Sequence, residues 1–236
     1  MKKTITTYSP IAAAVAGLFM LTACSKSADT TPTQTAKPET ASEQTLLVDE
    51  SRLSIYHGVD LTSDLSHLSD NQHKMLSLLI DASKIMDDLF WKQAFFEDKD
   101  AFLSSISDEK VRHFAAINYG PWDRLNGDTP FLSGYEDKAL GAEFYPHDME
   151  KKEFATADFG DKQGLYSMVK RDEAGNLYSV PYSEAFKSEL MKASDLLKKA
   201  SELAEDESFK QYLQLRSEAL LSNDYLASDM AWMDMK

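Results

Sequence analysis

The chain has 236 residues, of which 43% are hydrophobic and 27% charged, with a formal net charge of −14 and a single cysteine. This composition excludes a disordered polyelectrolyte, and one cysteine cannot form a disulfide within the chain. The acidic balance, with a sequence pI near 4.7, argues against nucleic acid as a partner, because binding to phosphates needs a basic face. The length allows one domain or two small ones.

Residues 1–23 have the pattern of a bacterial lipoprotein signal peptide. Two lysines precede an apolar stretch, which ends in Leu21-Thr22-Ala23-Cys24, where small residues suit the signal peptidase. We therefore expect cleavage before Cys24 and attachment of a diacylglycerol, with fatty acids such as palmitate, to its thiol, so that the membrane is a partner through this residue. The alternative is an ordinary secretory signal in which the cysteine occurs by chance.

The residue after the cysteine, Ser25, bears on localisation. By resemblance to Gram-negative lipoproteins, the absence of aspartate at this position favours the outer membrane, with the protein facing the periplasm. Residues 24–45 are rich in Ser, Thr, Ala and Pro and contain no aromatic residue, so they cannot bury enough apolar area to offset ordering entropy. We expect a flexible tether there, and one helical lobe over residues 46–236.

The first half of the lobe has the signals of three helices. A possible capping box at residues 69–72 starts a long helix, whose apolar residues recur at helical spacing as far as Phe96. A shorter helix is expected over residues 99–106. Another is expected from Asp108 to near Asn118, because the following Gly-Pro pair cannot continue a helix.

Residues 118–146 differ in character, because Gly, Pro, Asn and Asp interrupt them every few positions while aromatic residues remain frequent. A loop this polar would stay open unless its aromatic residues pack, so we expect an ordered loop of the functional type. Asp123 can orient Arg124 or cap the turn, or it can contact a substrate. Tyr119 and Trp122 can pin the loop by packing, or they can stack on a peptide or sugar.

A short helix capped by Asp148 is expected next, followed by a β-hairpin formed by residues 165–171 and 177–180. A long amphipathic helix is expected over about residues 183–204. A second helix, ending near Ser222, would complete an αα-hairpin. The predicted fold class is therefore mainly α with a small β-hairpin (α+β).

The last residues, 225–236, are rich in leucine, methionine and tryptophan, whereas domains usually end in exposed polar residues. We expect an apolar surface at the end of a chain that has been cut short. The alternative is a tail helix that docks back into the core.

No established catalytic motif is found in the sequence. Its five histidines form no HExxH pair, and there is no GxSxG, P-loop, GxGxxG or Nudix glutamate motif. We therefore expect neither a metal site nor a catalytic residue within this chain.

Five segments have a distinctive composition. They are Asn118-Tyr119-Gly120-Pro121-Trp122-Asp123-Arg124, residues 141–149, residues 177–182, residues 217–221 and residues 227–235. Together they resemble a bacterial branch of the dipeptidyl peptidase III-like zinc metallopeptidases, in a lipoprotein form. The resemblance extends over about residues 48–236.

The resemblance implies a secreted or periplasmic enzyme that removes dipeptides from peptide N-termini, of which this chain is the N-terminal portion. In that family the zinc is held by an HExxGH helix and a glutamate from a second helix, and none of those positions exists in this sequence. Zinc and a peptide substrate are therefore expected for the full-length protein. This chain alone is expected to bind no zinc and to be inactive.

The same resemblance makes one loop the candidate for lining a substrate cleft, through the side chains of Asn118, Tyr119, Trp122, Asp123 and Arg124. The competing hypothesis is a non-enzymatic periplasmic lipoprotein that acts as a helical binding or scaffold module.

Overall fold

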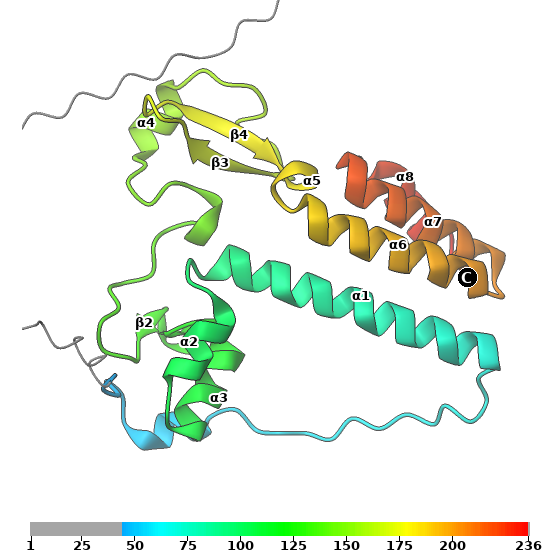
Figure 1. The fold of residues 1–236 in the computed structure, drawn as a ribbon, viewed down its shortest axis with the longest axis horizontal. Helices are drawn as coiled ribbons and strands as arrows, with labels where there is room; N and C mark the ends of the chain where they lie inside the picture. The colour runs from blue at the N-terminus through cyan, green and yellow to red at the C-terminus, as the bar shows by residue number, and fades with distance from the viewer. Residues whose placement is uncertain (1–43, 236) are drawn as a thin grey trace, which may run out of the picture. The chain divides into compact units, whose positions relative to one another are not determined.

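The computed structural model describes residues 44–235, so the expected signal peptide and Cys24 lie outside the described residues. The described part consists of helices and two small antiparallel sheets of two strands each (Figure 1). This confirms the mainly α class with a small hairpin. Within residues 44–235, none of the helices has the length and apolar character that a membrane span requires.

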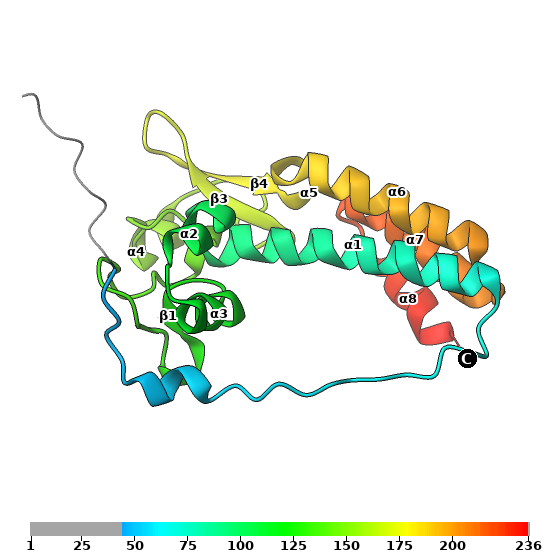
Figure 2. The same cartoon turned by 60° about the horizontal axis from the view of Figure 1, so that its bottom comes forward.

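The long helix α1, Asp70–Ala94, starts at the predicted capping box. The Ser69 side chain accepts a hydrogen bond from the Gln72 N–H at 3.2 Å, and the Gln72 side chain accepts one from the Ser69 N–H at 3.0 Å. Leu89 then packs against Leu190 in a buried cluster, so α1 lies alongside the helix that carries Leu190 (Figures 1 and 2). Local capping and an apolar stripe together fix this helix.

The expected αα-hairpin is formed by α6, Lys187–Leu203, and α7, Glu207–Ser222. The prediction of one continuous helix over residues 183–204 was wrong, because α5, Tyr182–Ala185, is separated from α6 at Phe186. Phe186 has φ −120° and ψ 29°, outside the helical region, and its ring is buried in the cluster with Leu190. Tertiary packing therefore overrides the helical periodicity at this point.

The shorter helices agree with the sequence. They are α2, Lys99–Ser105, and α3, Glu109–Asn118, and each begins at an aspartate whose side chain accepts backbone N–H groups. Helices α2 and α3 and the end of α1 enclose a cluster of buried side chains rich in aromatic rings: Trp91, Phe95, Phe102, Ile106, Val111, Phe114, Ala115, Trp122, Phe131 and Leu132. The segment around Leu47 lies against this cluster: Leu46 and Val48 pack on it, and the Leu47 N–H donates to the Phe131 carbonyl at 2.8 Å.

The predicted β-hairpin is present as β3, Ser167–Arg171, and β4, Leu177–Pro181. A second sheet, of β1, Trp122–Asp123, and β2, Thr129–Pro130, was not predicted, because strands of two residues carry no alternation. The last helix, α8, Leu226–Asp234, packs on α7.

The helix that Asp148 was expected to cap is α4, Lys151–Thr156, and its N-cap is Glu150. The Asp148 carboxylate instead lies 3.1 Å from the guanidinium of Arg171. The expectation was wrong because an arginine from a distant strand competes for that carboxylate.

The pair of Glu153 and Arg171 predicts a pH-dependent stability. Arg171 donates to both carboxylate oxygens of Glu153, at 2.6 and 3.1 Å, and these bonds lower the pKa of Glu153 below its ordinary value of 4.5. Because the pKa of Glu153 is lower in the folded than in the unfolded protein, the ion pair stabilises the fold above pH 4.5. This stabilisation is lost as the pH falls through the pKa of Glu153 in the folded protein.

We therefore expect the melting temperature of the wild type to fall more steeply below pH 4.5 than that of Glu153→Gln. Glu173→Gln, in the exposed hairpin turn, is the matched control and should follow the wild type. Thermal melts followed by circular dichroism across the acidic range measure this. Parallel curves for the wild type and Glu153→Gln would exclude a contribution from the pair.

Candidate functional site

The loop after α3 is shaped by backbone conformations that few residues tolerate. Tyr119 caps the helix in the left-handed region, with φ 55° and ψ 45°. Gly120 follows at φ 139°, and a Cβ atom there would lie 3.2 Å from the Trp122 ring. The glycine is therefore required both by the turn and by the close approach of the indole.

Asn118 connects the loop to its surroundings. Its side chain is buried, and its Oδ1 accepts hydrogen bonds from the Tyr56 hydroxyl and the Arg124 N–H, both at 3.0 Å. Its Nδ2 donates to the Phe114 carbonyl at 2.9 Å. All three contacts join parts of the protein, so the visible role of this amide is to hold the loop in place.

Asp123 is also fully buried. Its carboxylate accepts hydrogen bonds from Arg52 at 2.6 and 3.2 Å, and from the Leu125 N–H at 3.1 Å. The last bond caps a short 3-10 helix, Arg124–Asn126, so the interpretation of Asp123 as a turn cap is confirmed. Its cationic partner is Arg52, not the neighbouring Arg124.

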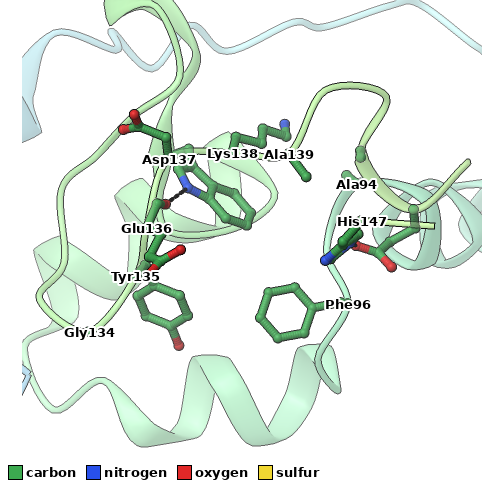
Figure 3. A pocket seen from close by; sticks show the side chains of 12 residues that line it. Ala94, Phe96, Gly134, Tyr135, Glu136, Asp137, Lys138, Ala139 and His147 are labelled. Atoms are coloured by element: carbon green, nitrogen blue, oxygen red, sulfur yellow. Dashed lines mark hydrogen bonds and ion pairs between the residues drawn. The ribbon is translucent and has the colours of Figure 1, made fainter. Parts of the chain in front are cut away.

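Tyr119 and Trp122 both pack against protein. The Tyr119 hydroxyl donates to Asp87 at 2.5 Å, and this bond raises the pKa of the tyrosine. Its ring meets Phe90 edge-on at 4.6 Å, and Arg124 lies 5.9 Å from both ring centroids. The Trp122 indole N–H donates to the Glu136 carbonyl at 2.8 Å (Figure 3).

Beside Trp122 the surface is hollowed into a cavity of about 490 Å³ between the end of α1 and residues 134–147. Figure 3 shows Phe96 extending toward Tyr135 in this space, with His147 nearby. The His147 Nε2 lies 2.9 Å from the Glu143 carboxylate, and its ring lies edge-on to Phe96 at 6.0 Å. Burial raises the pKa of Tyr135.

Residues from two of the distinctive sequence segments line the cavity. Residues 118–124 contribute Trp122, and residues 141–149 contribute Glu143 and His147. Aromatic rings beside a carboxylate, an imidazole and a lysine give both apolar contact and hydrogen-bonding groups.

Of the five residues predicted to line a cleft, Trp122 borders this cavity, and Asn118, Tyr119, Asp123 and Arg124 are not among its lining residues. Whether a substrate reaches any of the five stays a prediction. Sequence reasoning did not single out Phe96, Tyr135, Glu143 or His147. The composition of residues 141–149 was the available signal for the last two.

Zinc does not fit the part of the chain that the structure describes. Within residues 44–235, no group of three or more His, Cys, Asp or Glu side chains is arranged to hold a metal ion. The HExxGH motif does not occur in residues 1–236 either.

Comparisons with known proteins identify a curated relative of the chain. No protein-family model matches the chain. Nudix hydrolase 3 from Arabidopsis thaliana is 32% identical, over 79% of this chain and 32% of that protein. The glutamate motif of Nudix enzymes is absent from this sequence, so the match gives no reason to assign Nudix chemistry to it.

Two solved structures share the fold. Dipeptidyl peptidase III from Caldithrix abyssi has a TM-score of 0.74 and 38% identity, over 79% of this chain and 37% of that one. Dipeptidyl peptidase III from Corallococcus sp. strain EGB has a TM-score of 0.71 and 32% identity, with the same coverage. The chain thus spans little more than a third of the length of either structure. Over the matched part, the chain is similar in sequence and fold to these dipeptidyl peptidase III enzymes.

Proposed function

We propose that this chain forms one helical lobe of a zinc-dependent hydrolase of the dipeptidyl peptidase III type. The whole protein would remove dipeptides from the N-termini of peptides. The observation that carries the proposal is the shared fold at 38% identity over 79% of the chain. The zinc ligands would lie in the part of the enzyme that this chain does not span.

Within this proposal, the role of the chain is to shape and hold one wall of the substrate site. The cavity beside Trp122 supports this role, because residues of two family-like segments line it together with the exposed ring of Phe96. Phe96 is 53% exposed and lines the cavity, so its ring is accessible to a ligand there.

A chimera tests the proposal directly. The matched segment of the Caldithrix abyssi enzyme is replaced by residues 44–235 of this chain, and dipeptide release from a chromogenic substrate is measured. We expect activity that a chelator removes and zinc restores, and no activity from this chain alone. A chimera that melts cooperatively but releases no dipeptide would overturn the proposal.

We also propose that Cys24 carries the lipid and anchors the protein in the outer membrane, facing the periplasm. The support is the sequence Leu21-Thr22-Ala23-Cys24 after an apolar stretch, together with Ser25.

Replacing the cysteine tests the anchor. In a Gram-negative host, Cys24→Ser is expected to move the protein from the membrane fraction to the soluble fraction and to abolish labelling with palmitate. Ser25→Ala should change neither, and Ser25→Asp should retain the labelled protein at the inner membrane. An unlabelled, soluble wild type would contradict lipidation.

A further inference from the structure

The turn between β1 and β2 contains an asparagine that is followed by a glycine. Asn126 is the last residue of the short 3-10 helix, and Gly127 caps that helix. Both residues are exposed. Of the five asparagines in residues 1–236, Asn126 is the one that precedes a glycine.

Asparagine is among the thermolabile residues, because its side-chain amide can react with the backbone. In this turn, the Gly127 nitrogen would give up its proton and form a bond to Cγ of Asn126. The bond between Cγ and Nδ2 breaks, and ammonia leaves with that proton. Water then opens the resulting imide ring at either carbonyl, which gives aspartate or isoaspartate. The net change replaces the amide NH2 with the OH of a water molecule, without oxidation or reduction.

The backbone of the turn favours the residue that permits this attack. Gly127 lies in the left-handed region, with φ 68° and ψ 30°, where glycine is the preferred residue. Its missing Cβ atom leaves the approach to its own nitrogen open. The surroundings are open as well, since a Cβ placed there would meet no atom within 4 Å beyond its chain neighbours.

A second asparagine provides a comparison within the same chain. Asn176 is exposed in the turn between β3 and β4, and its Nδ2 donates to the Asp172 carboxylate at 3.1 Å. The Nδ2 of Asn126 donates to the Thr129 hydroxyl at 2.9 Å. The two amides are therefore alike in exposure and in hydrogen bonding. They differ in the residue that follows, because Asn176 precedes the buried Leu177.

We propose that Asn126 is a site of spontaneous deamidation and that the reaction loosens the loop that carries Trp122. Isoaspartate routes the backbone through the side chain and adds a methylene group between β1 and β2. The pairing of Asp123 with Thr129 depends on the length of this connection. This inference does not depend on the proposed function.

Ageing of the purified full chain in water labelled with heavy oxygen tests the proposal. The incubation is mildly alkaline, which favours loss of the proton from the backbone nitrogen. Digestion in ordinary water follows, so that only changes made during ageing carry the label in mass spectrometry. We expect label at position 126 to appear at least about tenfold faster than at position 176, because Gly127 has no Cβ. Equal rates at Asn126 and Asn176 would overturn the proposal.

Two variants and one solvent condition test the role of the turn. Gly127→Ala adds a methyl group, and Asn126→Gln leaves the glycine in place but requires a larger ring for the same attack. Both should lose the label at position 126 and keep the wild-type rate at Asn176. Labelling of Gly127→Ala at the wild-type rate would overturn the proposal. Labelling of Asn126 in urea but not in the folded chain would also overturn it, because the turn would then protect the amide.

The effect on the loop is measured by thermal melts of aged samples. The aged wild type is expected to melt at a lower temperature than the fresh wild type, whereas Asn126→Gln should melt at the same temperature before and after ageing. An unchanged melting temperature in a wild type that has become isoaspartyl at position 126 would show that the longer backbone does not loosen the loop.

Discussion

Replacement of Phe95 by alanine is expected to lower the free energy of unfolding by about 3–5 kcal/mol. The ring is 1% exposed and lies at the centre of the aromatic cluster. Its centroid is 4.6 Å from that of Phe102, 5.7 Å from Trp122 and 6.1 Å from Tyr135. Removing it leaves a cavity that three large, mutually packed rings cannot easily close.

The adjacent residue offers a matched control, because Phe96 has the same side chain but is 53% exposed. Phe96→Ala is expected to change the free energy of unfolding by less than about 1 kcal/mol. Urea unfolding followed by circular dichroism gives both values. Equal losses for the two variants would show that the burial of Phe95 does not govern the stability of this region.

The contrast between Phe95 and Phe96 also shows what sequence patterns can resolve. The helix α1 was predicted correctly because its signals are local: a capping box within four residues and an apolar stripe at helical spacing. At its end, two phenylalanines stand side by side, and their different burial is decided by elements far along the chain. Helical periodicity carries no information about those elements.

The same difference between local signals and contacts of distant elements explains what the sequence patterns predicted wrongly or did not predict. The break at Phe186 follows from packing against Leu190 and α1, which competes with a good helical pattern. The pairing of Leu46 with Leu132 joins residues far apart in sequence. Neither feature leaves a signal within a window of a few residues.

For the candidate site, composition singled out two segments that border the cavity, but it gave no information on the direction of their side chains. Residues 118–124 were predicted to line a cleft as a unit, whereas the structure buries Asn118 and Asp123 and places Trp122 at the cavity. The neighbours Asp123 and Arg124 suggested a local ion pair. The actual pair is formed with Arg52, 71 residues earlier, and only the fold could reveal it.

That distant pair gives the second large prediction, in which Asp123→Ala lowers the free energy of unfolding by about 3 kcal/mol. The carboxylate is fully buried and accepts three hydrogen bonds, so its removal leaves the Leu125 N–H and the Arg52 guanidinium without their acceptor. The loss should lie at the lower end of the range for a broken buried pair, because the Arg52 side chain is 31% exposed and can still be hydrated.

A double-mutant cycle with Arg52→Ala separates the ion pair from the capping of the turn. If the ion pair carries the effect, the double variant should lose less free energy of unfolding than the two single variants lose in sum. We expect a difference of about 1 kcal/mol or more. Asp137→Ala, an exposed carboxylate in the same region, should stay within about 0.5 kcal/mol of the wild type. Strict additivity in the cycle would assign the loss to the hydrogen bond with the Leu125 N–H. The ion pair between Arg52 and Asp123 would then contribute little to holding the wall of the cavity that Trp122 forms.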